Sequence, residues 1–228
     1  MRASRRLLFV APRQVDLSAV EVPEPATGQL VVRTLWSGIS TGTELLAYRG
    51  LIDPDLPLDE RIGSLGGTFR YPFAYGYSCV GVVEESRGTV PTGSAVFAFH
   101  PHQDRFVVAE TDTVVLTPQT DPRAATLLPL VETALQITLD AGPVAHEQVV
   151  VLGLGAVGVL TSVLLQRAGA RVIAAEPMPD RRAARDLLDE LPLSAFPATE
   201  IAFEDAASAY EALDRRTAGL LHVALRYA

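Results

Sequence analysis

The sequence predicts a mixed α/β protein in which a β-rich module is followed by a single strand–helix–strand unit. The first 120 residues consist of short β-rich runs separated by Gly, Pro and Asp turns. Residues 148–158, Gln-Val-Val-Val-Leu-Gly-Leu-Gly-Ala-Val-Gly, have the pattern of a buried strand that enters a glycine turn. Only 52 residues follow Glu176, where this unit ends. A complete doubly wound domain needs roughly 130–150 residues, at about 30 per βαβ unit, so we expect a truncated one.

Composition limits the class of protein. The chain has 228 residues, and an apolar content of 48% is enough for a sizeable core. Its net charge of −8 argues against nucleic acid or an anionic membrane as a main partner. The single cysteine, Cys79, excludes internal disulfides and a multi-cysteine zinc site. Because the sequence shows neither a signal peptide nor a membrane-length apolar run, we expect a cytoplasmic protein.

The β-rich module has six runs that we expect to form strands. They are Leu7–Val10, Leu30–Leu35, Val80–Glu84, Ala95–Phe99, Arg105–Val108 and Thr113–Leu116. Between the second and third runs lies Leu51–Tyr75, which is rich in Pro and Gly. A segment of this length and composition is typical of a surface loop, and we expect it to cover a pocket.

Helical patterns dominate the rest of the chain. Asp121 is an expected N-cap, and apolar residues at helical spacing predict a helix that ends at Gly142-Pro143. A helix over Val159–Ala168 and a strand over Arg171–Ala175 follow the glycine turn. Further on, the patterns predict helices over about 180–191 and 204–213 and a last strand over 220–227.

The glycine turn matches the dinucleotide-binding fingerprint. Gly153, Gly155 and Gly158 fit G-x-G-x-x-G between a strand and a helix, and Glu176 closes the second strand 23 residues after Gly153. In a Rossmann site the helix N-terminus binds phosphate and the acid binds ribose hydroxyls. The alternative is that the glycines serve only strand–helix packing and that Glu176 is a solvated acid.

Four segments resemble the medium-chain dehydrogenase/reductase superfamily. Trp36–Glu44 is similar to its first active-site loop, and Gly76–Val83 to its G-H-E-x-x-G-x-V segment. Gly93–Phe97 resembles G-D-R-V-F, and Leu127–Leu135 resembles the helix before the nucleotide domain. The resemblance covers nearly the whole chain. It implies a GroES-like β domain, a linking helix, a Rossmann domain and a C-terminal return to the β domain.

The residues at the family's zinc positions depart from its pattern. Zinc-dependent members place a Cys, a His and a Cys or Glu around the metal, and the corresponding positions here are Ser40 or Thr41, Tyr77 and Leu128. Hydroxyls and a leucine do not form the nitrogen, sulfur and carboxylate shell that holds zinc. The Gly76-Tyr77 pair is most similar to bacteriochlorophyllide-type dehydrogenases and their zinc-independent relatives. The resemblance therefore implies a zinc-free protein.

The end of the chain resembles the family's C-terminal segment. Ala206–Leu213, which contains Ala209-Tyr210, is similar to its last helix, and Leu221–Tyr227 is similar to its terminal strand. The missing part is therefore internal, between about Glu190 and Ile201. We expect a GroES-like β-barrel domain over 1–125, a linking helix and truncated Rossmann-like βαβ remnant over 126–195, and a C-terminal helix and strand over 196–228 that return to the β domain.

Polar residues are expected to gather where relatives hold zinc, at the base of the substrate cleft. They are Ser40, Thr41, Thr43, Glu44, Tyr77 and Ser78. Such a group can hydrogen-bond a carbonyl or enol, and Tyr77 could donate a proton to a developing enolate. Glu44 is the preferred general base if it is buried, because burial raises the pKa of a carboxyl group. The alternative is a satisfied polar network that supports the loop.

Other candidates lie outside this group. His100 and His102 share one face of an extended segment, and because two imidazoles alone make a poor metal site, we expect one of them to act in the cleft as a hydrogen-bond donor or acid/base. Glu132 lies one helical turn beyond Leu128 and either faces the same cleft or is a surface carboxylate. Cys79, in an apolar stretch, is expected to be a buried inert thiol.

The sequence leaves three functions open. The preferred one is non-redox acid/base chemistry on a small organic biosynthetic intermediate, by isomerisation, elimination or cyclisation, because it requires neither a cofactor nor the missing half-domain. The second is NAD(P)-dependent oxidation or reduction of a hydroxyl, carbonyl or enone group, with the cofactor site completed by a second chain. The third is a non-catalytic binding or scaffold role. We expect a homodimer, because two parallel strands alone leave exposed edges.

Overall fold

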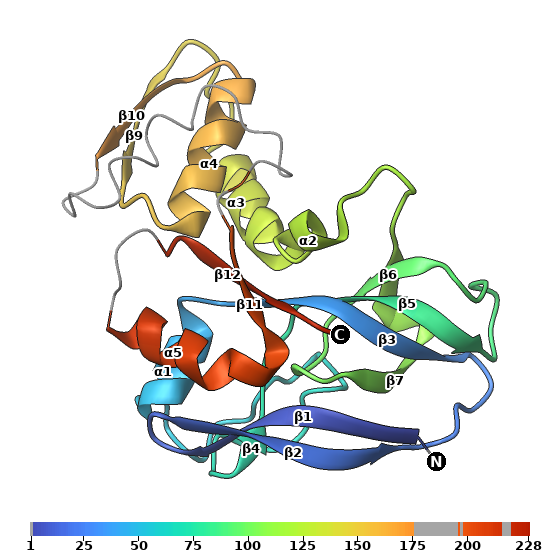
Figure 1. Cartoon of the computed structure of the whole chain (residues 1–228). Helices are drawn as coiled ribbons and strands as arrows, with labels where there is room; N and C mark the ends of the chain where they lie inside the picture. Colours follow the sequence, from blue (N-terminus) through green and yellow to red (C-terminus); the bar gives the residue numbers. More distant parts are fainter. Residues whose placement is uncertain (1, 176–195, 197, 216–219) are drawn as a thin grey trace.

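The computed structural model describes residues 2–175, 196, 198–215 and 220–228 and has the expected mixed α/β fold (Figure 1). Its strands are β1 (Arg2–Ala11), β2 (Gln14–Val22), β3 (Gln29–Ile39), β4 (Phe73–Ala74), β5 (Cys79–Ser86), β6 (Ala95–Ala98), β7 (Arg105–Ala109), β8 (Thr113–Val115), β9 (Gln148–Leu152), β10 (Arg171–Ala175), β11 (Ala198–Ala202) and β12 (His222–Arg226). Its helices are α1 (Thr43–Arg49), α2 (Pro122–Ala125), α3 (Leu128–Asp140), α4 (Ala156–Arg167) and α5 (Ala206–Asp214), with 3-10 turns η1 (Glu110–Asp112) and η4 (Phe203–Asp205).

Two sheets form the β region, one antiparallel and one antiparallel except for the parallel pair β11–β12. A three-stranded sheet has the order β2-β1-β4. A larger sheet of the described chain has the order β11-β12-β3-β5-β6-β8, with β7 also paired to β3. All six expected strands are present as β1, β3 and β5–β8. The sequence analysis missed β2 and β4, which are the two partners of β1.

The expected linking helix is present but divided in two. Asp121 is the N-cap of α2, and its Oδ1 accepts a hydrogen bond from the Arg123 backbone N–H at 2.9 Å. Pro129 occupies the first turn of α3, which explains the division, because proline removes a backbone donor that a continuous helix would need. The helix ends at Asp140, before Gly142, which has a φ of 72°.

The strand–helix–strand unit contains β9, α4 and β10. The strands β9 and β10 pair in parallel, with Gln148 opposite Arg171 and Leu152 opposite Ala175. In the described residues they form a two-stranded sheet. This sheet and α4 lie beside α3, away from the β region (Figure 1). Glu176 and the helix expected over 180–191 lie outside the described residues.

The C-terminal segment returns to the β region, as expected. β12 pairs antiparallel with β3, and α5 packs against α1. The sequence analysis missed β11, which pairs in parallel with β12 through Ala198–His222 and Ala202–Arg226. The segment β11–α5–β12 is thus a second crossover unit, but it extends the sheet of the β region rather than the β9–β10 sheet.

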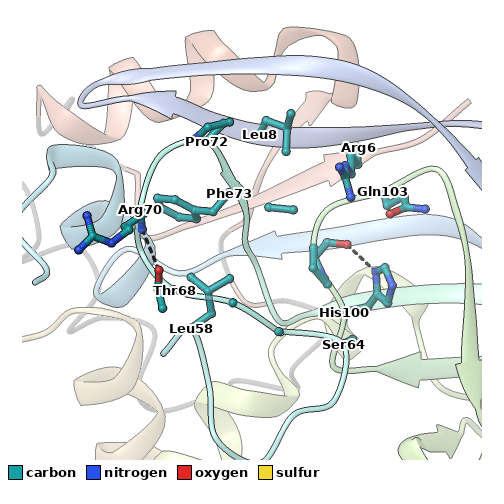
Figure 2. Close-up of a pocket in the computed structure, with 14 residues that line it drawn as sticks. Arg6, Leu8, Leu58, Ser64, Thr68, Arg70, Pro72, Phe73, His100 and Gln103 are labelled. Atoms are coloured by element: carbon teal, nitrogen blue, oxygen red, sulfur yellow. Dashed lines mark hydrogen bonds between the residues drawn. The ribbon is translucent and has the colours of Figure 1, made fainter. Parts of the chain in front are cut away.

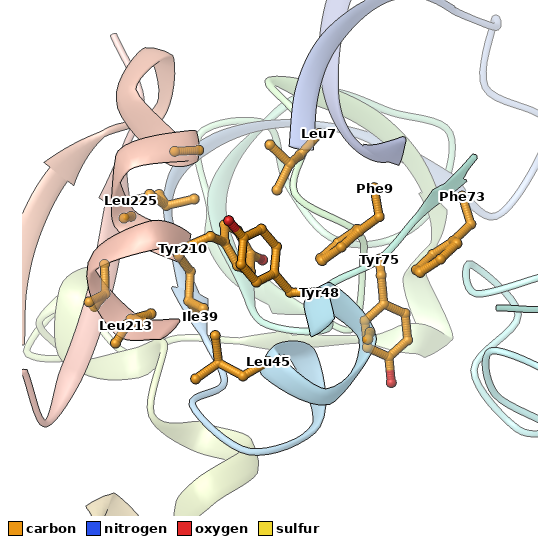
Figure 3. Close-up of a cluster of buried hydrophobic side chains, with 14 of the residues drawn as sticks. Leu7, Phe9, Ile39, Leu45, Tyr48, Phe73, Tyr75, Tyr210, Leu213 and Leu225 are labelled. Carbon is orange, nitrogen blue, oxygen red and sulfur yellow. The ribbon is translucent and has the colours of Figure 1, made fainter. Parts of the chain in front are cut away.

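An aromatic core joins these layers (Figure 3). Phe9 of β1 stacks on Phe73 with ring centroids 5.1 Å apart, and Tyr210 of α5 meets the edge of Phe9 at 5.3 Å. Tyr48 of α1 lies 5.3 Å from Tyr210. Burial of rings of this size contributes strongly to stability and fixes α1 and α5 against the three-stranded sheet. The loop that carries Ser40 therefore rests on a rigid base.

Candidate functional site

A group of three hydroxyls lies where the sequence predicted the base of a cleft. The hydroxyls of Ser40, just before α1, and Thr43, at its start, lie near the Tyr77 phenol and act on its pKa. Gly76 has a φ of 113°, and a Cβ there would lie 2.7 Å from the His102 ring, so this turn requires glycine. Ser40 is buried, Tyr77 is half-buried and Thr43 is exposed, which leaves this group accessible from one side.

The Tyr77 phenol is a proton donor at neutral pH. Burial, together with the nearby charge of Glu44, raises its pKa to about 12, although hydrogen bonds with Ser40 and Thr43 oppose this shift. A protonated phenol can donate a hydrogen bond to a carbonyl, enolate or alkoxide oxygen.

Glu44 lies just behind this group and is completely buried. Its Oε1 accepts a hydrogen bond from the Ser40 backbone N–H at 2.9 Å. Its Oε2 accepts from the Tyr210 hydroxyl at 2.5 Å and lies 2.9 Å from His102 Nε2. Both carboxylate oxygens are therefore used within the protein, by groups from three separate segments.

The network continues on the other side of His102. Its Nδ1 lies 2.7 Å from the Ser37 hydroxyl, which lies 2.9 Å from the Tyr227 hydroxyl. A neutral His102 that carries its proton on Nε2 satisfies every member, because it donates to Glu44 and accepts from Ser37. We refer to Ser37, Glu44, His102, Tyr210 and Tyr227 as the Glu44 network.

This geometry corrects the expectation for Glu44 and His102. Glu44 is buried, as the general-base hypothesis required, but it has no exposed atom and no free face toward a substrate. His102 is equally enclosed. A fully satisfied buried network fixes one conformation of the surrounding chain. Its role here is to hold Ser40 and the turn before α1 in place, which is the alternative that the sequence left open.

Ser78 and His100 are also directed away from the Tyr77 group. The Ser78 hydroxyl donates to the carbonyl of Thr126 at 2.7 Å and so joins β5 to the end of α2. The His100 ring stacks on Phe106 at 3.8 Å, and its Nδ1 lies 2.9 Å from the Pro101 carbonyl. Burial lowers the pKa of His100 to about 4, so the ring is neutral at pH 7. It lines a separate cavity, described below.

The remaining candidates have ordinary environments. Thr41 is half-buried beside Ser40, and Glu132 is exposed on α3. Cys79 is buried, its thiol donates to the carbonyls of His100 and Pro101, and burial raises its pKa, as an inert thiol requires.

The donor set around Tyr77 does not fit zinc. The residues present are hydroxyls, and Glu44 and His102 already bind each other. Within the described ranges, no three His, Cys, Asp or Glu side chains come together as a metal site would need.

The glycine turn has the geometry of a phosphate-binding turn. Gly153 has a φ of 93°, and Gly155 is the N-cap of α4 in an extended conformation. A Cβ on Gly158 would lie 1.9 Å from the Gly153 carbonyl oxygen, so glycine is also needed for α4 to pack on β9. The same glycines therefore serve strand–helix packing and give the turn a backbone conformation that fits the pyrophosphate of a dinucleotide.

Sequence reasoning missed three members of the Glu44 network. These members are Ser37, Tyr210 and Tyr227. Ser37 and Tyr227, which contact each other, are 190 residues apart in the sequence, and Tyr210 is 166 residues from its partner Glu44. Tyr210 had a signal, because the Ala209-Tyr210 pair was recognised, but only as a marker of the last helix. Ser37 had no such signal, because it lies in a run of consecutive buried residues, Ser37–Ile39, rather than in an alternating pattern.

Comparison with known proteins supports the fold. No family model matches the chain. Over 80 residues it is 36% identical to 2-desacetyl-2-hydroxyethyl bacteriochlorophyllide A dehydrogenase of Cereibacter sphaeroides, a match that spans 35% of this chain and only 22% of that enzyme. The chain thus matches under a quarter of that relative's length.

Solved structures match over the whole chain. The 2R,3R-butanediol dehydrogenase of Bacillus subtilis has a TM-score of 0.82 at 15% identity and covers 98% of this chain and 99% of its own. An oxidoreductase/dehydrogenase of unknown specificity from Escherichia coli, involved in membrane biogenesis, has a TM-score of 0.81 at 11% identity, with both chains covered completely. The chain therefore has the fold of the medium-chain dehydrogenases/reductases, with a two-stranded parallel sheet, β9 and β10, in the part that the structure describes.

Proposed function

We propose that this protein catalyses non-redox acid/base chemistry on a small organic intermediate, such as an isomerisation, elimination or cyclisation, with Tyr77 as the group that donates to the substrate oxygen. One observation carries the proposal: a half-buried phenol, protonated at neutral pH, lies near the hydroxyls of Ser40 and Thr43 at the expected base of the cleft. When solvent water takes a proton from the carbon next to a carbonyl, the electron pair of that C–H bond moves to the carbonyl oxygen. A phenol at that oxygen stabilises the enolate and then protonates it.

The topology of the strand–helix–strand unit favours chemistry without a hydride carrier. In the described residues, β9 and β10 pair only with each other, whereas β11 pairs with β12 of the β region. A dinucleotide lies across both halves of a doubly wound sheet. The described strands offer the half that would bind the adenine side.

A second candidate function is NAD(P)-dependent oxidation or reduction of a hydroxyl, carbonyl or enone. The conformations of Gly153, Gly155 and Gly158 favour it, and so does the similarity in structure to dehydrogenases. Bound NAD(P) would supply or accept the hydride. The glycine turn would hold its pyrophosphate, and Tyr77 would donate to the substrate oxygen, as in the first proposal.

A titration separates the two functions. Losing half the contacts of a cofactor that is normally bound at micromolar affinity, about −8 kcal/mol, leaves about −4 kcal/mol, which is millimolar. We therefore expect NADH and NADPH to show little change in fluorescence at protein concentrations up to about 100 µM. A dissociation constant below about 10 µM would overturn the non-redox proposal and favour a cofactor site completed across two chains.

A deuterium-exchange assay tests Tyr77 without a known substrate. The protein is incubated in D2O with small ketones, enones and hydroxy ketones, and loss of the proton next to the carbonyl is followed by NMR. Tyr77→Phe should slow exchange by about 10²–10⁴-fold, the usual contribution of one acid/base group. Tyr71→Phe is the control, because the Tyr71 hydroxyl donates to the Ala47 carbonyl, outside the site. Full exchange activity in Tyr77→Phe would show that the chemistry lies elsewhere.

A further inference from the structure

A cavity of about 390 Å³ lies on the β region, outside the Tyr77 group (Figure 2). Its walls are β1 and β4, the loop over 58–72, and the segment that carries His100, Pro101 and Gln103. The loop is part of the segment that the sequence predicted would cover a pocket. Its size is within the range of small-molecule sites.

Arg6 is the unusual residue of this cavity. Its Nε is buried and has no hydrogen-bond partner among the described residues. Figure 2 shows the side chain extending from β1 toward the segment of Gln103 and His100. A buried guanidinium N–H without an acceptor costs free energy, and this cost is avoided when an acceptor binds.

The neighbouring residue, Arg5, shows how a guanidinium on β1 is satisfied by carboxylates of the protein. Arg5, which points to the opposite face of β1, donates to Asp104 at 2.8 Å and to Glu204 at 2.7 Å. No carboxylate lines the cavity on the Arg6 side, within the residues that the structure describes. Arg5 has its anions within the fold, whereas Arg6 does not.

The rest of the lining adds positive charge and polar groups. Arg70 stands at the cavity and pairs with Asp55, with both side chains about two-thirds exposed, 66% and 68%. Ser64 and Thr68 contribute hydroxyls. Apolar contact comes from Leu8, Leu58 and Phe73, on the side of the cavity toward β1 and the loop.

We propose that this cavity is a binding site for a small organic oxyanion, a carboxylate or phosphate on a short carbon body, with Arg6 as its anchor. A guanidinium presents planar N–H donors that match two oxygens of either group. The position of Arg6 on a strand paired with β2 and bridged to Gln103 holds this donor rigidly. The proposal is independent of the chemistry at Tyr77.

Calorimetric titration of the full chain tests the proposal with three probes at constant ionic strength. L-malate represents carboxylates, inorganic phosphate represents phosphates, and glycerol is the neutral control. We expect malate, phosphate or both to bind with a dissociation constant between about 10 µM and 10 mM, and glycerol not to bind. The anion with the lower dissociation constant shows whether the site prefers a carboxylate or a phosphate. Absence of binding by both anions at about 20 mM would overturn the proposal.

Two variants place the binding at Arg6. Arg6→Gln should weaken binding at least tenfold, whereas Arg87→Gln, which removes an exposed arginine that does not line the cavity, should leave it unchanged. Equal weakening in both variants would indicate only a general charge effect and would contradict the site.

A third variant covers the case in which Arg6→Gln does not fold. A Cβ on Gly66 meets no atom within 4 Å, so Gly66→Leu adds bulk to the lining without backbone strain and should also abolish binding. The His100 ring provides a direct probe, because the chain has only four histidines and only this one lines the cavity. Its NMR signals should shift on titration with the bound anion. Binding without a His100 shift would place the anion elsewhere.

Discussion

The β region and the strand–helix–strand unit bury their apolar residues to different extents. In the β region Phe9, Phe97 and Phe106 are at most 2% exposed. In the unit, Leu152 of β9 is 80% exposed and Ile173 of β10 is 48% exposed. Alternate residues of β9 and β10 face α4, so the exposed ones lie together on the opposite face.

This difference in burial indicates which part of the chain can fold without cover from another molecule. The β region combines an aromatic core with the Glu44 network, in which each buried polar side chain has a hydrogen-bond partner. The unit buries a small hydrophobic cluster of Val144, Leu165 and Ala170. One face of its two-stranded sheet, however, is not covered by any of the described residues. A parallel sheet normally has both faces covered. We therefore expect the β region to be the more stable of the two parts.

The largest effect should come from breaking the Glu44 network. Glu44→Ala leaves His102, Tyr210 and the Ser40 N–H without their acceptor, all in the interior. A buried donor that is left without its acceptor typically costs about 1–3 kcal/mol, and this variant leaves three of them. Urea denaturation should show this loss, and Glu132→Ala, at an exposed carboxylate of α3, should change stability by less than about 0.5 kcal/mol. A small loss in Glu44→Ala would mean that water or rearrangement satisfies the network.

A smaller and local effect should come from Gly158→Ala. The added Cβ would lie 1.9 Å from the Gly153 carbonyl oxygen, so α4 must move away from β9. Overpacking of this kind costs about 1–3 kcal/mol. Hydrogen exchange should accelerate in β9, α4 and β10 and remain unchanged in β3 and β5. Gly63→Ala is the control, because a Cβ there meets no atom within 4 Å. Equal acceleration in both regions would show that they unfold as one unit.

Most elements of both regions were predictable because their signals are local. The runs of β3 and β5, the N-cap Asp121 and the glycine turn at Gly153 each act within a few residues. By contrast, α1 has only seven residues, too few for a helical period to stand out, and its sequence overlaps the loop signature. β11 has weak strand composition and exists because β12 offers it a parallel partner.

The candidate site was predictable in its members but not in its arrangement. The resemblance brought together Ser40, Glu44 and Tyr77, and both Ser40 and Glu44 act on the pKa of Tyr77. It could not show that Glu44 turns inward, because that depends on Tyr210, 166 residues away, and on His102, 58 residues away. Arg6 had no signal in the sequence, since a buried N–H without a partner is a property of the fold alone.

Two buried histidines of the β region should make its stability depend on pH. Burial lowers the pKa of both His100 and His222 to about 4 from an ordinary value of 6.5. Between pH 6.5 and about 4 the unfolded chain therefore binds more protons than the folded one, and stability falls as pH falls through this window. Above pH 6.5 their contribution is complete. His100→Gln should make the decline in the urea midpoint less steep than in the wild type. An unchanged slope would mean that His100 is not held neutral.

The smallest effect on the folded monomer should come from Leu152→Ser, although it should change assembly. We propose that a second copy of the chain covers the face of β9 and β10 that carries Val150, Leu152 and Ile173, because exposed apolar faces of this kind mark interfaces. Light scattering after gel filtration should show a dimer at about 10 µM wild-type chain. Leu152→Ser should shift it toward monomer with a change in urea midpoint below that of Gly158→Ala, since the side chain is already 80% exposed. Val115→Ser, at a 52% exposed residue of β8, should leave the dimer intact. A wild type that is monodisperse and monomeric would contradict this proposal, and the unit would then be stable with an uncovered face.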